Sequence, residues 1–293
     1  TLEDLKFQSP NQKRINEFFR ELEFDSLIVD ADQTQEIVNE KRDYKTILKK
    51  DSFNKLISDL VKIGEFALDL ETTSKHPLRA EIVGISFSHQ AFRAYYIPFA
   101  HKYFGSPKQL DKDETLRRLK PILENPRLKK YGHNIKYDLI VFRNEGINLN
   151  GIGFDSMLAS YVLNPSKNNH NMDDLAWEFL KHKTIQYKDV TGSGAKQIDF
   201  EKVEIEKATD YAAEDSDITW SFKQKMEPLL LDKTLDLYRN MEIPLIEVLA
   251  DIEMTGVLLD INKLKLLSKR LENDLIKAEK EIYQLSGKKI KKK

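Results

Sequence analysis

Cysteine is absent from the 293-residue chain, and neither sign of charge predominates. Without thiols there is no disulfide, cysteine nucleophile or cysteine-bound zinc, so a metal must be held by oxygen or by one of six histidines. The formal net charge of −1 excludes a generally basic nucleic-acid-binding surface. Because there is also no long apolar run and no basic leader before an apolar stretch, we expect a cytoplasmic protein, neither secreted nor membrane-bound.

Secondary-structure patterns divide the chain into three sections. Residues 1–50 are expected to form an N-terminal linker, with an amphipathic helix over 15–24. From Gly64, the runs "EFALDL", "EIVGISFS" and "FRAYYIPF" predict three consecutive strands, and "KKYG" at 129–132 predicts another. An α/β fold follows, a mixed sheet flanked by helices. Helices are expected at 114–123, 135–144, 155–163, 172–180 and 207–226.

The third section, residues 235–285, contains two long helical patterns interrupted near 255–260. Apolar residues recur at three- and four-residue steps in the second pattern. We expect these side chains to form the core of a helical hairpin. The recurring residues are Leu264, Leu267, Leu271, Leu275, Ala278, Ile282 and Leu285.

The first candidate for chemistry is the pair of carboxylates in "FALDLETTS". Alternate side chains of a strand share a face, so Asp69 and Glu71 point to the same side. Two adjacent carboxylates repel each other unless a cation lies between them, which indicates a divalent-metal site. Taken alone the motif is weak, because Asp251 and Glu253 repeat the spacing in a helical pattern where such residues face apart.

Two further candidates lie on predicted helices. Asn134 and Asp138 in "GHNIKYDLIVF" are four residues apart and share a helix face. Asn134 could instead simply cap its helix. Tyr211 and Asp215 in "YAAEDSDIT" are one turn apart, beside two small alanines. Look-alikes are Asn169 with Asp173, where capping is a sufficient explanation, and Tyr238 with Glu242.

The three elements together, in this order, resemble the 3′-5′ proofreading exonuclease domains of bacterial DNA polymerase I (family A). These belong to the tyrosine-bearing branch of the DEDD exonuclease superfamily and have an RNase H-like fold. The stretches "MDDLAWEFLKHKTI", "GSGAKQIDF" and "YAAEDSDIT" are similar to the family around its third motif. "IPLIEVLADIEMTGVLLD" resembles its entry into the polymerase domain, and "FFRELEFDSL" its junction with the preceding nuclease.

The resemblance implies a set of metal ligands and catalytic residues. Asp69, Glu71, Asp138 and Asp215 would hold two divalent cations, Mg²⁺ or Mn²⁺. One cation, held by Asp69, Glu71 and Asp215, would generate the attacking hydroxide, which Tyr211 would orient. The other, shared by Asp69 and reached by Asp138 directly or through water, would stabilise the leaving 3′ oxygen. The product would be a 5′-nucleotide.

Substrate-binding residues are also implied by the resemblance. Thr72, Asn134 and Tyr187 fall at positions that contact the single-stranded end, and Tyr187 would stack on a base. A plain surface or core tyrosine is an equal alternative for Tyr187. The chain departs from the family at Lys75, where a leucine commonly wedges near the terminal base; Leu78 lies three residues further on.

The expected organisation is a linker at 1–50, an exonuclease domain at 51–232 and the start of a polymerase domain at 233–293, ending in a lysine-rich tail. No polymerase motif is found, so this chain should not polymerise. The expected partners are a single-stranded DNA 3′ end and the remainder of a polymerase chain, with the protein a monomer. Two alternatives stay open, an RNase D-like 3′-5′ exoribonuclease and a catalytically weak DNA-binding or scaffold domain.

Overall fold

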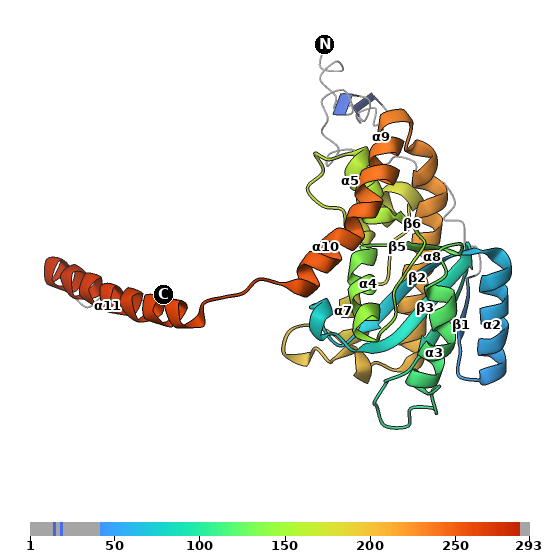
Figure 1. Ribbon diagram of the computed structural model, residues 1–293, viewed down its shortest axis with the longest axis horizontal. Coiled ribbons are helices and arrows are strands. Elements are labelled where there is room, and N and C mark those ends of the chain that lie inside the picture. The colour runs from blue at the N-terminus through green and yellow to red at the C-terminus, as the bar shows by residue number, and fades with distance from the viewer. Residues whose placement is uncertain (1–13, 16–17, 20–41, 288–293) are drawn as a thin grey trace, which may run out of the picture. The chain divides into compact units, whose positions relative to one another are not determined.

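The computed structural model describes residues 14–15, 18–19 and 42–287 (Figure 1). The helix expected over 15–24 and the lysine tail after Gly287 therefore lie largely outside the described residues. The chain forms two compact units, Thr1–Glu247 and Val248–Lys293, and each is considered by itself. In the described part of the chain, no helix has the length and apolar character needed to cross a membrane.

A six-stranded mixed sheet lies at the centre of the first unit. Its strand order is β1-β4-β3-β2-β5-β6. The pairs β2–β3 and β3–β4 are antiparallel, whereas β1–β4, β2–β5 and β5–β6 are parallel. The strands are β1 (Asp43–Thr46), β2 (Glu65–Thr72), β3 (Ile82–Gln90), β4 (Arg93–Pro98), β5 (Lys129–Gly132) and β6 (Ile152–Asp155).

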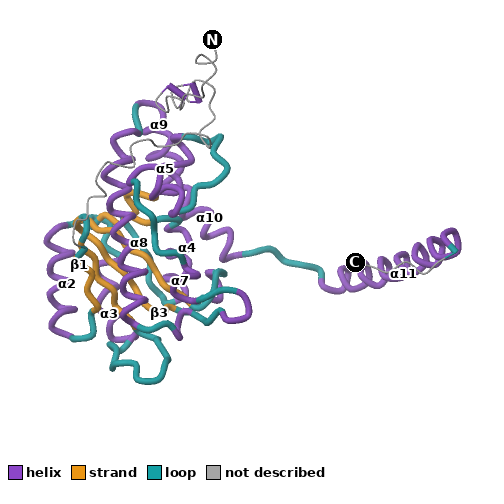
Figure 2. Tube along the Cα trace, turned by 180° about the vertical axis from the view of Figure 1, so that it is seen from behind, coloured by secondary structure: helices purple, strands orange, loops and turns teal. Residues whose placement is uncertain are grey.

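Helices cover both faces of this sheet. Figures 1 and 2, seen from opposite sides, show α8 across one face and α3 and α4 on the other. Helix α8 contacts five of the strands, so it is the main cover of its face. The α-helices of the first unit are α2 (Lys50–Ile63), α3 (Lys112–Leu123), α4 (Ile135–Asn144), α5 (Ser156–Leu163), α6 (Met172–Leu175), α7 (Tyr187–Thr191), α8 (Ile205–Met226) and α9 (Asp232–Leu237).

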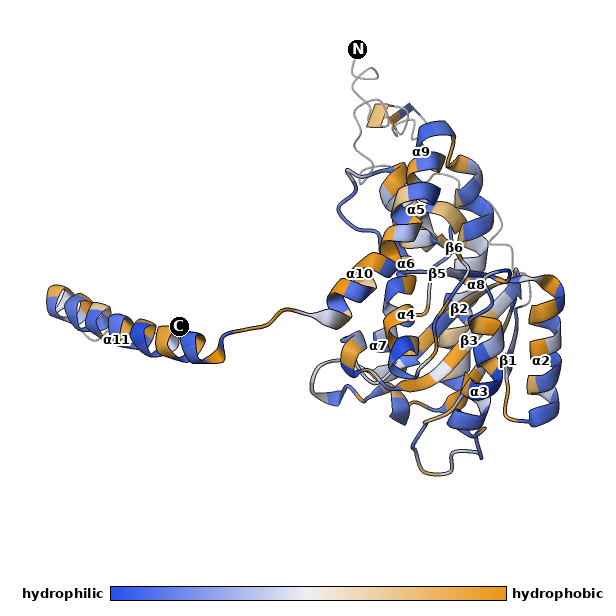
Figure 3. Cartoon of the chain, in the orientation of Figure 1, coloured by the Kyte–Doolittle hydropathy of each residue, from blue (hydrophilic) through white to orange (hydrophobic). Residues whose placement is uncertain are grey.

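The alternating side chains of β2 explain why the sheet is buried on both faces. Phe66 and Leu68 are fully buried on one side, and Ala67 is fully buried on the other, in the cluster that includes Ile218 of α8. Figure 3 shows hydrophobic residues along the central strands. Burial on both faces places β2 rigidly, and with it the two carboxylates near its end.

The three consecutive strands, the "KKYG" strand and the flanking helices are confirmed. The structure adds β1, β6, α2 and α7. Strand β1 is an edge strand of the sheet, although its residues fall in the expected linker. The helix expected over 172–180 continues beyond α6 as a π-helical turn, Ala176–Leu180.

The first unit also continues beyond residue 232, where the exonuclease domain was expected to end. Tyr238, in a π-helical turn after α9, is buried, and its hydroxyl bonds the backbone N–H and C=O of Asp155 at 2.7 and 3.0 Å. Its ring lies 5.9 Å from that of Phe154. These contacts explain why the first compact unit extends to Glu247.

The helical region after the sheet consists of α10 (Ile243–Thr255) and α11 (Ile261–Ser286). The apolar stripe predicted to form a hairpin core lies on α11, and all of its side chains are exposed. Within the described residues the expected core packing is therefore not formed. The periodicity predicted the helix correctly, but it cannot supply a surface to cover the stripe.

Candidate active site

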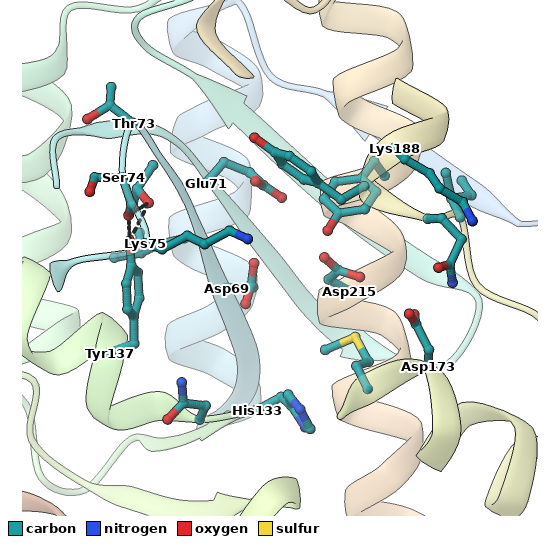
Figure 4. Close-up of a pocket in the computed structure, with 18 residues that line it drawn as sticks. Asp69, Glu71, Thr73, Ser74, Lys75, His133, Tyr137, Asp173, Lys188 and Asp215 are labelled. Atoms are coloured by element: carbon teal, nitrogen blue, oxygen red, sulfur yellow. Dashed lines mark hydrogen bonds between the residues drawn. The ribbon is translucent and has the colours of Figure 1, made fainter. Parts of the chain in front are cut away.

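A cleft of about 770 Å³ opens where β2 and β5 end (Figure 4). Strand β2 pairs with antiparallel β3 on one side and with parallel β5 on the other, so loops and helices from several parts of the chain converge there. The lining comprises residues 69–75, His133, Asn134, Tyr137, Met172, Asp173, residues 185–188, Tyr211 and Asp215.

Three of the four predicted metal ligands meet in this cleft. Asp69 and Glu71 project from β2, and Asp215 projects from α8 across the sheet face (Figure 4). One carboxylate oxygen from each lies within 4.8 Å of the other two. Oε1 of Glu71 is buried without a hydrogen-bond partner in the structure, so this oxygen is available to a cation.

Asp138 is not among the residues that line the cleft. It is 3% exposed, and its Oδ1 accepts a hydrogen bond from the N–H of Leu70 at 3.1 Å. Strand β5 pairs with β2 only as far as Ala67, so Leu70 is beyond the end of that ladder. Asp138 thus accepts the hydrogen bond of a β2 N–H that β5 does not reach. This N–H belongs to the residue between the two β2 carboxylates.

Burial raises the pKa of every carboxyl in the group, and repulsion from Asp69 adds to this for the other three. Burial raises the pKa of Asp69 to about 7. The pKa values of Glu71, Asp138 and Asp215 are raised well above their usual range, first by burial and then by the charge of Asp69. Ionisation of all four acids has a high free-energy cost unless a positive charge lies nearby. Within the described residues, none of the four forms an ion pair with a lysine, arginine or histidine.

The donor set therefore fits a hard divalent cation. All the candidate ligands are carboxylate oxygens, which Mg²⁺ and Mn²⁺ prefer, and one of these oxygens is buried and unpartnered. His133 also lines the cleft, but it bonds Ser156 through Nδ1 at 2.8 Å, and burial lowers its pKa to about 4.

Tyr211 borders the carboxylates from α8. The negative charge of Asp215, followed by burial, raises the pKa of its phenol far above the usual range, so Tyr211 remains a neutral hydroxyl. Its ring packs edge-on to Tyr187 at 6.2 Å and lies 5.9 Å from buried Phe200. Tyr187 in turn stacks on Phe200 at 6.2 Å and is 38% exposed, leaving part of its ring open to the cleft.

Asn134 does not cap α4 through its side chain, so the capping alternative is wrong. The residue occupies the N-cap position with φ +60°, a left-handed conformation that non-glycine residues rarely adopt. The first helical N–H, that of Ile135, is accepted instead by Oδ2 of Asp155 at 2.7 Å. Asn134 is exposed at the cleft, and its amide has no capping duty.

Thr72 lies at the cleft wall with its hydroxyl already engaged. It bonds the carbonyl of Ser74 at 3.1 Å and the hydroxyl of Tyr137. The Tyr137 hydroxyl also donates to the Ser74 carbonyl, so these three residues brace the loop after β2 against α4 (Figure 4). The next residue of this loop is Lys75, which lines the cleft and is exposed.

Asp173 is the clearest difference from expectation, because its spacing from Asn169 was attributed to capping. The cap of α6 is in fact Asn171, whose side chain accepts from Asp174 N at 2.8 Å. Asp173 lines the cleft and is bonded by the hydroxyl of Thr184. Tyr137, Gln186 and Lys188 were likewise not predicted as lining residues. Of these, Tyr137 alone could have been found from the sequence, because it lies three positions after Asn134 and so shares its helix face.

Glu214, beside Asp215, fixes α8 to the segment that leads to Tyr187. Its Oε2 accepts from the N–H of Ile185 at 2.6 Å, and its Oε1 contacts Nε2 of His182 at 2.9 Å and the guanidinium of Arg42. Hydrogen bonds to His182 and to the Ile185 N–H, together with charge, hold the pKa of Glu214 below its usual range despite burial. Glu214 therefore positions Asp215 rather than joining the metal ligands.

Comparison with known proteins identifies the family of the chain. The sequence model of a 3′-5′ exonuclease family matches residues 44–231. DNA polymerase I of Pseudomonas aeruginosa is 38% identical over 95% of this chain, and that of Rhizobium leguminosarum is 36% identical over 83%. The matches cover 32% and 26% of those proteins, so the chain spans about a third of their length or less.

A solved structure shows the same fold. The POL domain of Pol1 from M. smegmatis, in complex with DNA primer-template and dNTP, aligns with a TM-score of 0.63 at 18% identity, covering 84% of this chain and 38% of that one. The family match includes both β2 carboxylates, Asp138, Tyr211 and Asp215. The chain belongs to the 3′-5′ exonuclease domain family of DNA polymerase I.

Proposed function

We propose that this protein is a metal-dependent 3′-5′ exodeoxyribonuclease that releases 5′-nucleotides from single-stranded or frayed DNA 3′ ends, the proofreading activity of a DNA polymerase I. The observation that carries the proposal is the meeting of Asp69, Glu71 and Asp215, whose oxygens lie within 4.8 Å. The unpartnered Glu71 oxygen supports a metal-binding role for this group. A cytoplasmic location and a monomeric state are part of the same proposal.

The chain's own residues have distinct parts in the proposed reaction. When bound, two divalent cations lower the pKa of water and neutralise charge on the leaving oxygen. Asp69, Glu71 and Asp215 would hold the cations, and Asp138, which accepts the N–H of Leu70, would support them directly or through water. Tyr211, as a neutral phenol, orients the attacking water through its hydroxyl and takes no proton from it. Thr72, Asn134 and Tyr187 hold the substrate end.

The test is digestion of a 5′-labelled single strand by the purified protein with Mg²⁺ or Mn²⁺. Shortening from the 3′ end, lost in Asp69→Ala and Asp215→Ala, supports the proposal. Asp251→Ala is the matched control, because Asp251 shares the Asp-x-Glu spacing but is exposed on α10. Asp173→Ala is unsuitable as a control, since Asp173 lines the cleft. An undigested strand, or full activity in both cleft variants, refutes the proposal.

The two alternatives predict different results in the same assay. An RNase D-like enzyme would degrade RNA faster than DNA of the same sequence. A scaffold would bind a single strand and leave it intact. All four carboxylates are present, which favours the active enzyme over the scaffold.

A further inference from the structure

The charged side chains that line the cleft include two lysines whose presence the metal ligands do not explain. Its lining includes four carboxylates, those of Asp69, Glu71, Asp173 and Asp215, and two lysines, Lys75 and Lys188. Two divalent cations would offset these four acids, and the two lysines together exceed the one further negative charge of buried Asp138. The lysines would then give the loaded cleft an excess positive charge, although the whole chain is close to neutral.

The two lysines lie on opposite sides of the carboxylates. Figure 4 shows Lys75 extending from the loop after β2 toward Asp69 and Glu71, and Lys188 beyond Asp215 on the other side. Both residues are exposed. The usual duty of an exposed lysine is a surface ion pair or the covering of apolar surface. Across residues 42–287, no carboxylate lies within 4.0 Å of either ammonium group.

Lys188 also follows directly after the half-exposed Tyr187 on α7. An open aromatic ring beside a cation is the arrangement that binds single-stranded nucleic acid, because the ring stacks on a base while the cation meets the backbone. The stacking of Tyr187 on buried Phe200 holds the ring at the cleft. We therefore expect the group that Lys188 binds to lie next to a nucleotide that is stacked on Tyr187.

We propose that Lys75 and Lys188 bind two different backbone phosphates of the substrate strand, one on each side of the carboxylate group, so that the strand lies across the cleft between them. This inference rests on the proposed function and adds residues that hold its substrate. A lysine is a point charge that reads no base, so both contacts accept any sequence. Such indifference suits an enzyme that removes one nucleotide after another.

The test is binding of a fluorescent oligothymidylate, followed by anisotropy in Ca²⁺ over a range of salt concentrations. Ca²⁺ is a hard cation with the same preference for oxygen ligands, so it offsets the carboxylates during the measurement. Lys75→Gln and Lys188→Gln should each raise Kd roughly two- to five-fold at moderate salt. Each should lower the slope of log affinity against log salt by roughly 0.7, the value for one phosphate contact with a single strand.

Two controls sharpen the result. Lys75→Arg and Lys188→Arg should restore the salt slope, because the charge is kept. Lys55→Gln, which removes an exposed lysine of α2 outside the cleft lining, should leave both Kd and slope at the parent values. If both cleft Gln variants bind with the parent slope, or if the parent itself fails to bind the strand, the inference is overturned.

The same proteins separate this inference from the proposed activity. A parent protein that binds the strand with the expected slope but fails to cut it in Mg²⁺ or Mn²⁺ contradicts the activity and supports the lysine contacts. A parent that cuts the strand while both Gln variants keep its affinity and slope contradicts the lysine contacts alone.

Discussion

Asp138 accepts the backbone N–H of Leu70 at 3.1 Å, and so a helix side chain holds β2 at the one residue that separates Asp69 from Glu71. The carboxylate of Asp138 therefore has two roles. As a hydrogen-bond acceptor, Asp138 replaces the ladder that β5 no longer supplies. As a buried carboxylate beside Asp69, it adds negative charge to the site.

The two duties can be separated by substitution. Asp138→Asn keeps an oxygen acceptor for Leu70 and removes the charge, so we expect a stable fold with strongly reduced exonuclease activity. Asp138→Ala leaves the buried N–H without a partner, which should lower the free energy of unfolding by about 1–3 kcal/mol. Thermal and denaturant unfolding check the stability, and the strand-digestion assay checks the activity. Equal stability losses in the two variants would contradict the role assigned to the Leu70 contact.

Removal of the Asp69 charge should change stability in a pH-dependent manner. The pKa of Asp69 is about 7 in the folded protein against 3.8 ordinarily, so the folded state binds the proton more tightly. In EDTA, stability from this group is therefore lost as pH rises from about 4 to about 7. The advantage of Asp69→Asn over the parent should grow across that window and level off above it. A constant difference in Tm from pH 4 to pH 8 would contradict the burial of this charge.

The affinity for a metal cation should depend on the same protonation. It should increase as pH rises, whereas the stability of the metal-free protein decreases. A cation must displace the protons that the raised pKa values retain. Apparent Mn²⁺ affinity should thus fall below pH 7, by roughly tenfold per pH unit for each proton displaced. Calorimetry in two buffers of different ionisation enthalpy gives both the affinity and the number of protons released. Affinity that is independent of pH between 5.5 and 8 would exclude these carboxylates as the ligands.

The hydroxyl of Tyr211 should matter for rate and not for folding. Tyr211→Phe keeps the ring against Tyr187 and Phe200, so we expect an unfolding transition like that of the parent. Loss of the group that orients the water should lower kcat by roughly 10- to 100-fold. Because the phenol stays neutral, the pH–rate profiles of parent and variant should have the same shape. A basic limb that disappears in the variant would show instead that Tyr211 ionises.

The exposed ring of Tyr187 should contribute to binding of the strand. Tyr187→Ala removes the stacking surface and should raise KM by roughly 5- to 100-fold, the range for loss of one base–aromatic stack. Tyr187→Phe should retain most of the affinity, since the ring remains stacked on Phe200. If Tyr187→Ala binds a single strand as tightly as the parent, Tyr187 is a packing residue only.

Part of the fold was predictable because its local patterns are strong. The alternation of β2 and the runs of β3 and β4 identify buried strands, and the three- and four-residue steps of α4 and α8 identify helices. Strands β1 and β6 were not recognised; each has four residues, as β5 has, so a strand of this length is at the limit of what a local pattern can indicate. They are strands because a neighbouring strand pairs with them, which is a tertiary effect.

The site was predictable for a different reason. The strand period places Asp69 and Glu71 on one face, but only the family-like sequence identifies Asp215 as their partner across the sheet. Asp173 and Lys188 were missed because the convergence of two short helices, α6 and α7, on the cleft leaves no trace in local spacing. The capping interpretation of Asn134 failed because Asp155, from another strand end, already takes that duty.

The central claim is that Asp69, Glu71 and Asp215 hold a catalytic cation. Anomalous diffraction from crystals soaked in Mn²⁺ tests it most directly, since the scattering identifies the metal and its ligands together. We predict a manganese peak coordinated by these three carboxylates, and a second on the side of Asp69 that faces Asp138. Occupied manganese elsewhere with none between the three carboxylates would contradict the claim.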